Sequence, residues 1–323
     1  GDGDLRRLDR VRRRCLRAAG RARDVRADAR HLARPAAVVG AATSGPRASV
    51  TSRPASWRFP NPATPLGSST YYSLRFSPPS LRDDLAILAA WRHQVRAILV
   101  EVSDPGVARL KLLWWCEELD KLPGGQPRHP LSQALQAVVS QHQLPLQPFL
   151  QMAGQVEEEI LRRPLPDSAA LIRACDADLG ALFELMAGCH GLTNPDRIAS
   201  ARAIGAFCAM VYRIRDSGWL ARQGRAPIPM DLLGPHDLTP NALRQGQHRA
   251  RLPEWLPELA RQAQALPARS SPLGALPPFA RVRARILASL LREIEALSYQ
   301  VVDQRLSLTP LRKLWIAWRT TWR

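Results

Sequence analysis

The chain has 323 residues, of which 46% are hydrophobic, so it is long enough for one or two domains with a sizeable core. It carries 46 Lys and Arg against 28 Asp and Glu, a formal net charge of +18, and nearly all of the basic residues are arginines. The five cysteines are dispersed and include no CxxC pair, which argues against a disulfide framework or a zinc site. No apolar run approaches the ~18 residues needed to span a bilayer, so the sequence predicts a soluble or peripheral protein.

Residues 1–66 form a first region that is rich in Arg, Ala, Pro and Ser. Fifteen arginines lie in residues 1–60 against five aspartates, so much of the net charge belongs here. The composition is typical of a disordered tail. A non-native extension, a basic arm for nucleic acid or acidic lipid, and a transit peptide are three open interpretations, although transit peptides contain few acids. We favour a tail without a specific role and expect no specific nucleic-acid partner.

From Ser80 onward the sequence pattern is helical, without a convincing strand. Apolar residues recur with a 3.6-residue period through 81–102, and Pro105 suits the first turn of a helix that ends at Gly124 and Gly125. Further helical stretches are predicted at 130–142, 146–163, 167–190, 195–213, 254–265 and 277–303. Proline-containing sequences at 164–166 and 227–229 separate some of them. We therefore predict one all-α domain over residues 67–323, built from antiparallel helices around a central space.

Three segments in this domain carry a family pattern. Residues 71–119 read YYSLRFSPPSLRDDLAILAAWRHQVRAILVEVSDPGVARLKLLWWCEEL, residues 203–233 read AIGAFCAMVYRIRDSGWLARQGRAPIPMDLL, and residues 291–319 read LREIEALSYQVVDQRLSLTPLRKLWIAWR. Together they resemble the squalene and phytoene synthase family, all-helical enzymes that join two prenyl diphosphates. A fourth segment, ACDADLGALFELMAG at 174–188, corresponds to a family segment from which both tyrosines are lost. The resemblance implies an isoprenoid-synthase-like helical bundle around a central cavity.

The two acidic motifs of that family are largely lost from this chain. The family's first motif, DDxxDE, is replaced by RAILVE at 96–101, and its second, NxxRDxxED, by YRIRDSGWL at 212–220. Only Glu101 and Asp216 remain as carboxylates. Mg²⁺ requires several oxygen ligands on one helix face if it is to neutralise a leaving diphosphate. We therefore expect no Mg²⁺ cofactor, unless the protein is active, and no metal-dependent condensation.

The remnant acids and the nearby arginines are the candidate site residues. Glu101 and Asp216 could take part in catalysis or hold a metal; the alternatives are a solvated helix face for Glu101 and an Arg–Asp network for Asp216. Arg96, Arg213 and Arg215 are candidates for substrate binding, because guanidinium groups bind diphosphate by bidentate hydrogen bonds without a metal.

Two alternatives to substrate binding are open at these positions. The three arginines could instead pair with Asp216, Glu101 or Glu184 and close the cavity. By the resemblance, Tyr72 belongs, with Tyr71 and Arg75, to the family's substrate-contact region; packing is the alternative role for an aromatic pair before a helix.

The C-terminal residues 308–323 predict an amphipathic, tryptophan-rich helix. They place Leu311, Leu314, Trp315, Trp318 and Trp322 at helical spacing between basic residues. Such a helix suits a membrane interface, and packing onto the domain is an equal alternative.

Two classes of function are open. We favour a catalytically degenerate family member that binds a prenyl diphosphate or other isoprenoid lipid, or a membrane-protein partner, as do relatives that serve as assembly factors. The alternative is an active isoprenoid synthase, a transferase that condenses two prenyl diphosphates head to head. We expect a cytoplasmic protein, peripheral at the inner face of a membrane in the lipid-binding case.

Overall fold

The computed structural model describes residues 55–322 except 226, 235–237, 246 and 269–271. Residues 1–54 of the tail predicted at 1–66 lie outside the described residues. The described part of the chain is helical and contains no strand, which confirms the all-α prediction. Among the described residues, no helix combines the length and apolar character that a membrane crossing requires.

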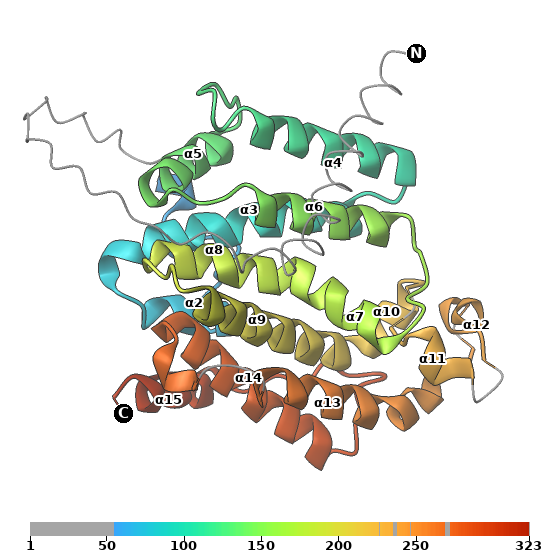
Figure 1. The fold of residues 1–323 in the computed structure, drawn as a ribbon. Helices are drawn as coiled ribbons and strands as arrows, with labels where there is room; N and C mark the ends of the chain where they lie inside the picture. Colours follow the sequence, from blue (N-terminus) through green and yellow to red (C-terminus); the bar gives the residue numbers. More distant parts are fainter. Residues whose placement is uncertain (1–54, 226, 235–237, 246, 269–271, 323) are drawn as a thin grey trace, which may run out of the picture.

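The helices have the following bounds (Figure 1): α2 Ser69–Arg75, α3 Arg82–Glu101, α4 Pro105–Asp120, α5 Pro130–His142, α6 Gln147–Ile160, α7 Ser168–Cys175, α8 Ala181–Cys189, α9 Pro195–Arg215, α10 Ser217–Arg222, α11 Met230–Leu233, α12 Pro240–Arg244, α13 Leu252–Ala268, α14 Pro278–Ala296 and α15 Pro310–Thr321. Short 3₁₀ turns include η1 Ala55–Trp57, and a π-helical turn, η3 Asp176–Gly180, joins α7 to α8.

Local sequence signals explain several helix starts. Pro105 lies in the first turn of α4, as predicted, and the Asp104 carboxylate accepts a hydrogen bond from Val107 N at 2.8 Å. Asn194 and Thr309 cap α9 and α15 in the same way. These side chains satisfy amide groups that have no partner inside the helix.

The helices stack in layers around α9 (Figure 1). Helices α4 and α5 pack against α6 and α3, which in turn pack against α8; α9 then lies between α8 on one side and α13 and α14 on the other, and α15 covers α14. Trp91 of α3 and Phe149 of α6 are fully buried, with ring centroids 5.0 Å apart in an edge-to-face pair. The core therefore joins segments that are far apart in the sequence.

The folded region begins before residue 67. Phe59 N donates to Asp83 Oδ1 at 3.0 Å, Asn61 Nδ2 donates to Ala86 O at 3.0 Å, and Thr64 is fully buried. These contacts attach residues 59–64 to α3. The predicted disordered tail is therefore too long at its C-terminal end, because the Phe59 amide and the Asn61 side chain find partners on that helix, and the Phe59 ring stacks on Tyr71 of α2.

The helix predicted at 277–303 corresponds to α14, which ends earlier than predicted, at Ala296. Ser298 and Tyr299 have positive φ angles of 48° and 58°, which an α-helix does not allow. The chain turns back there, and residues 305–308 line the central cavity. Gly218 allows this approach, because a Cβ at that position would collide with the backbone of Val302.

The helix predicted at 167–190 is interrupted by the π turn η3. Gly205 of α9 packs so closely on this turn that a Cβ would overlap the Leu179 carbonyl. A π turn adds one residue to a helical turn and therefore changes which side chains face inward. Asp178, in the middle of the turn, lines the central cavity.

Candidate functional site

A central cavity of about 780 Å³ lies between α3, α9, α14 and the segment 305–308. Its polar lining is dominated by cations. The basic side chains are Arg92, Arg96, Arg213, Arg215, Arg225, Arg283, Arg305 and Lys313, and the carboxylates are Glu159, Asp178 and Asp216. Among the described residues, eight Lys and Arg side chains thus face three acids, an excess of five positive charges.

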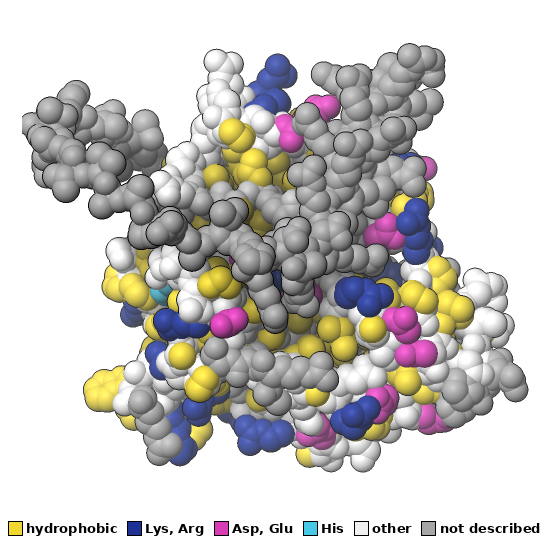
Figure 2. Space-filling view, in the orientation of Figure 1, with side chains coloured by type: hydrophobic (Ala, Val, Ile, Leu, Met, Phe, Trp, Pro, Cys, Tyr) yellow, Lys and Arg dark blue, Asp and Glu magenta, His cyan; other side chains and the backbone are white. Residues whose placement is uncertain are grey.

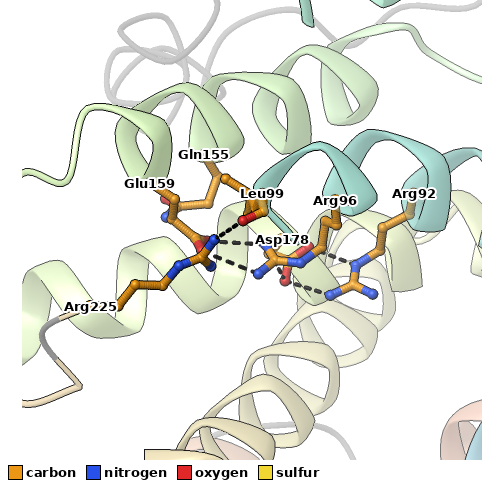
Figure 3. Close-up of polar contacts among 7 residues, drawn as sticks. All are labelled: Arg92, Arg96, Leu99, Gln155, Glu159, Asp178 and Arg225. Carbon is orange, nitrogen blue, oxygen red and sulfur yellow. Dashed lines mark hydrogen bonds and ion pairs between the residues drawn. The ribbon is translucent and has the colours of Figure 1, made fainter. Parts of the chain in front are cut away.

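One group of these residues, which we call the Asp178 cluster, consists of Arg92, Arg96, Glu159, Asp178 and Arg225 (Figure 3). Arg92 binds Asp178 through two hydrogen bonds of 2.6 Å each. Arg96 binds both oxygens of Glu159, at 3.0 and 3.3 Å, and its Nη1 lies 3.3 Å from Asp178 Oδ2. Arg96 therefore lies between the two carboxylates, with Arg225 on the other side of Glu159 (Figure 3).

Arg225 completes the Asp178 cluster from the segment after α10. Its Nη1 lies 3.4 Å from Glu159 Oε2, and its Nη2 donates to Leu99 O at 2.6 Å. The Leu99 carbonyl lies in the last turn of α3, where carbonyl groups have no helical partner. Arg225 thus ties the loop after α10 to the end of α3.

The pKa values in the Asp178 cluster show how strongly its charges are coupled. Burial alone would raise the pKa of Asp178. The charges of Arg92 and Arg96 outweigh this effect, so the net shift of the pKa is downward. In Glu159 burial again raises the pKa, and Arg96 and Arg213 bring it below its usual value. Both acids are therefore ionised at neutral pH.

Positive charge in this part of the cavity is not fully neutralised. Burial and the nearby Arg96 and Arg213 lower the pKa of Arg225, even though Glu159 acts in the opposite direction. Arg213 Nε is buried and has no hydrogen-bond partner among the described residues. An unpartnered buried donor is costly unless a ligand or water satisfies it, so this wall is suited to an anion.

A second group, the Asp216 cluster, consists of Arg215, Asp216, Arg305 and Lys313. Arg215 binds both oxygens of Asp216 at 2.7 Å, and Arg305 binds the same two oxygens at 2.7 and 3.0 Å. Burial raises the pKa of Asp216, but the hydrogen bonds from the two arginines produce a net decrease. Asp216 is therefore held in an Arg–Asp network, one of the two alternatives open from the sequence.

Lys313 closes the Asp216 cluster from α15. Its Nζ donates to Gly67 O at 3.1 Å and to Ser307 Oγ at 3.3 Å, and the residue is buried. Burial, and then the charge of Arg215, lower its pKa. No carboxylate is among these contacts, so Lys313 adds to the positive potential of the cavity.

Arg96 and Val100, both within the segment 96–101 that replaces the family's first acidic motif, line the same cavity as Asp216. Arg96 is largely enclosed, whereas Val100 lies at the mouth of the cavity and is 67% exposed. Glu101 does not line the cavity. Its exposed side chain lies 3.4 Å from Lys111 Nζ, so it occupies the solvated helix face.

Tyr72 does not fit the predicted substrate-contact role. It lies on the buried side of α2, outside the cavity lining, and its ring packs edge-on against Tyr71 at 5.3 Å. Helix α2 packs on α14, which explains why this side of the helix faces the core. Packing, the alternative open from the sequence, is what the structure shows, and Arg75 is exposed and does not line the cavity.

The donor set does not fit a Mg²⁺ cluster. Among the described residues there is no group of three or more His, Cys, Asp or Glu side chains that could hold a metal ion. Glu159, Asp178 and Asp216 are each within ion-pair distance of two arginines, and those cations would repel Mg²⁺. The absence of a metal cofactor stays a prediction about the protein in solution.

Several cavity residues were not among the sequence-based candidates. Arg92 lies one helical turn before Arg96 and could have been found from the i, i+4 spacing. Arg305 and Lys313 lie in the family-like C-terminal segment. Glu159, within three consecutive glutamates, and Asp178, in an irregular turn, carry no comparable signal.

Comparison with known proteins places this cavity in a family context. Residues 64–312 match the family model described as squalene/phytoene synthase. The chain is 28% identical over 229 residues to a presqualene diphosphate synthase of Sinorhizobium fredii, covering 70% of this chain and 81% of that protein. It is 26% identical over 261 residues to a phytoene synthase of Rhodobacter capsulatus, covering 77% and 76%.

Solved structures share the fold at lower sequence identity. A dehydrosqualene synthase in complex with a ligand superposes with a TM-score of 0.66 at 18% identity, covering 78% of this chain and 90% of that one. Squalene synthase HpnC from Alicyclobacillus acidocaldarius gives a TM-score of 0.57 at 18% identity, covering 71% and 88%. Since the family model spans most of the sequence and the fold agrees, the chain belongs to the squalene/phytoene synthase family.

Proposed function

We propose that this protein binds a prenyl diphosphate, or another isoprenoid lipid with a phosphate head group, in its central cavity without a metal cluster, and does not condense two such molecules. The observation that carries the proposal is the excess of cations in the cavity: eight Lys and Arg side chains against three carboxylates among the described residues. A partly buried excess of this kind is unfavourable unless an anion or solvent compensates it.

The lining suits both ends of such a lipid. Arg213 offers a buried donor without a partner, and a guanidinium group can bind two phosphate oxygens at once. Apolar side chains on the same walls can receive an isoprenoid chain: Leu179, Leu182, Trp219, Ile286, Leu290 and Leu306. The volume of about 780 Å³ is within the range of cavities that hold small molecules.

Loss of condensation follows from the charges that replace the metal ligands. Ionisation of a prenyl diphosphate requires that charge on the departing diphosphate be stabilised more strongly in the transition state than in the bound substrate. The arginines that pair with Asp178, Glu159 and Asp216 can bind the diphosphate of the intact substrate, but they offer no additional stabilisation to the departing diphosphate in the transition state. We expect binding without turnover.

An active isoprenoid synthase is the alternative function. It is supported by the names of two relatives, a presqualene diphosphate synthase and a phytoene synthase, which are similar to this chain over most of their own length. In that case Mg²⁺ would be required, and the arginine pairs would have to open to admit it.

Calorimetric titration of the purified protein with farnesyl diphosphate, in EDTA and in Mg²⁺, tests the binding part of the proposal. We expect similar affinity in both conditions and weak binding of farnesol, which lacks the charge. Arg213→Gln should lower the affinity by roughly tenfold, the loss of a hydrogen bond to a charged group. The matched control is Arg163→Gln, an exposed arginine that is paired with Glu158 outside the cavity.

Incubation with labelled farnesyl or geranylgeranyl diphosphate and Mg²⁺ tests the chemistry. Formation of squalene, phytoene or a cyclopropyl intermediate would overturn the proposed loss of catalysis and establish the alternative. Binding that strictly requires Mg²⁺ would contradict the metal-free site even if no product forms.

We also propose a peripheral location at the cytoplasmic face of a membrane, because prenyl lipids partition into bilayers. The support is the outer face of α15, where Trp315, Trp318 and Trp322 are exposed. A membrane-protein partner, the other expectation from the sequence, stays a prediction.

A further inference from the structure

Helix α15 has two different faces. Its inner face, Lys313, Ile316, Ala317 and Thr320, is buried against the domain, where α15 packs on α14 and α2. Its outer face carries apolar side chains with exposed fractions between 41% and 78%: Leu311, Leu314, Trp315, Trp318 and Trp322. The helix is thus fixed to the domain by one stripe, and the tryptophans project from the other.

Two arginine-lined grooves flank this outer face. A groove of about 560 Å³ borders Leu314 and is lined by Arg75, Arg82 and Arg281. A groove of about 360 Å³ borders Trp315 and is lined by Arg285, Arg292 and Arg319. No carboxylate is among the described residues that line either groove.

Among the described residues, no carboxylate forms an ion pair with the arginines of these grooves. Arg281 Nε is buried and has no hydrogen-bond partner in the described part of the chain. Among the described residues, Arg292 contacts neutral groups of its own helix, at 3.4 Å to Ala288 O and 3.1 Å to Ser289 Oγ. Arg319 lies over the ring of Trp315, 5.2 Å from its centroid, which places a cation beside an exposed aromatic side chain. In Figure 2, hydrophobic and basic side chains likewise adjoin at the lower left, over the position of α15.

We infer that this surface docks onto a bilayer that contains anionic lipids, with the tryptophans of α15 in the interface and a lipid phosphate group in each arginine groove. Tryptophan is favoured at the boundary between head groups and acyl chains, and basic residues next to it are attracted by anionic head groups. The exposed apolar side chains of α15 therefore suit the boundary with the acyl chains, and the basic grooves on either side suit the anionic head groups. The inference rests on the proposed peripheral location and adds the lipid class and the groups that recognise it.

This docking also explains how the membrane and the cavity are related. Lys313 lies on the inner face of α15 and lines the central cavity, whereas Leu314 and Trp315, the next residues, lie on the outer face. One helix thickness therefore separates the proposed lipid surface from the cavity.

Flotation of the full chain with vesicles tests the inference. We expect strong binding to vesicles of phosphatidylcholine and phosphatidylglycerol, weak binding to phosphatidylcholine alone, and loss of the difference at high salt. Arg285→Gln combined with Arg292→Gln should lower the affinity for anionic vesicles by roughly 10- to 30-fold. Trp318→Ser combined with Trp322→Ser should weaken binding to both kinds of vesicle.

Matched variants separate this surface from the overall basic charge, including that of residues 1–54. Arg251→Gln with Arg261→Gln removes the same charge from arginines that are paired with Glu254 and Glu258 on another surface. Val107→Ser with Leu110→Ser removes exposed apolar side chains from α4. Both controls should bind like the unmodified protein.

Three results would overturn the inference: equal binding to neutral and anionic vesicles, an equal loss in the charge-matched control, or binding only to vesicles that contain a membrane protein. Binding to neutral vesicles alone would leave the peripheral location intact and remove the lipid specificity. Because farnesyl diphosphate binding is measured without vesicles, failure of this inference is distinguishable from failure of the cavity proposal.

Discussion

Asp178 and Arg92 form a bidentate pair, with Nε–Oδ1 and Nη2–Oδ2 distances of 2.6 Å each, at the wall of the central cavity. The face of α3 that carries aspartates in the family pattern carries Arg92 and Arg96 here, and the carboxylates come from the π turn and from α6. The polarity of the site is thus inverted, and the same fold presents cations where a metal cluster would need acids.

Asp178→Asn should destabilise the fold and strengthen anion binding. It leaves Arg92 and part of Arg96 without their counter-charge, which should lower the free energy of unfolding by about 2–3 kcal/mol. Inorganic diphosphate should then stabilise the variant more than the unmodified protein, because the freed guanidinium groups can bind it. Thermal unfolding with and without diphosphate measures both effects.

The control for this variant is Asp303→Asn, since Asp303 is almost fully exposed and lies 4.0 Å from its nearest cationic partner, Arg222. It should change stability by less than about 0.5 kcal/mol. If Asp178→Asn is as stable as this control, the pairing with Arg92 does not support the fold.

The Asp178 cluster should also contribute to acid unfolding. Burial raises the pKa of both Asp178 and Glu159, but the nearby arginines outweigh it and produce a net decrease. A depressed folded-state pKa gives stability that is present above the unfolded value, near 4, and is lost as the pH falls through the folded value. Below about pH 4, the slope of stability against pH, measured by urea unfolding, should be smaller in Asp178→Asn than in the unmodified protein, by at most about 1.4 kcal/mol per pH unit, the limit for one proton. Parallel curves would be inconsistent with this coupling.

The general fold was predictable from the sequence because its signals are local and repeated. The apolar stripe of 81–102 became α3, the proline at 105 opened α4, and the segments 71–119 and 203–233 identified the family. Each of these depends on neighbours within a few helical turns, where spacing determines the structure. Arg96 could be placed in the cavity for the same reason.

The partners of Arg96 were not predictable in this way. A continuous helix was predicted over 167–190, and the π turn changes the register at Asp178. Glu159 follows Glu157 and Glu158, so only the rotation of α6 within the bundle decides which of the three acids meets Arg96. Tyr72 was misplaced because its burial depends on how α2 packs within the bundle, which is a tertiary contact. The site depends on long-range packing, which the local pattern does not contain.

Restoring acids should create a divalent-metal site. Arg96→Asp together with Leu220→Asp adds two carboxylates to a cavity that already contains Glu159, Asp178 and Asp216. We expect the double variant to be less stable in EDTA and to gain several degrees in melting temperature with Mg²⁺, which the unmodified protein should not. Arg163→Asp with Leu161→Asp makes the same charge change at exposed positions. An identical Mg²⁺ response in that control would show that the effect is not specific to the cavity.

His190 should make the protein less stable as the pH falls towards 5. Burial, and then the nearby His142, lower its pKa to about 4, and its Nε2 is buried without a hydrogen-bond partner among the described residues. Between about pH 6.5 and pH 4 the unfolded chain therefore binds more protons than the folded one, and stability decreases as the pH is lowered. His190→Phe should reduce the difference in melting temperature between pH 7 and pH 5, since the ring already stacks on Phe279 at 5.5 Å.

The control for the pH effect is His248→Asn, an exposed histidine with a positive φ angle that asparagine tolerates. Its pH dependence should match that of the unmodified protein. A parallel reduction in both variants would assign the effect to overall charge and not to His190.

The contact between α9 and the π turn should tolerate no additional atom, so Gly205→Ala is expected to be destabilising. A Cβ at this position overlaps the Leu179 carbonyl and the Gly180 backbone. These groups directly follow Asp178, so we expect their displacement to disturb its pairing with Arg92. Overpacking of this kind costs about 1–3 kcal/mol. Gly154→Ala is the matched control: Gly154 lies inside α6, nothing lies within 4 Å of its Cβ position, and the substitution should stabilise the helix by about 0.5–1 kcal/mol. Urea unfolding of the two variants measures the difference, and diphosphate titration of Gly205→Ala shows whether the cavity is disturbed with the turn. If both alanine variants are equally stable, the close packing of α9 on the π turn does not constrain the position of Asp178.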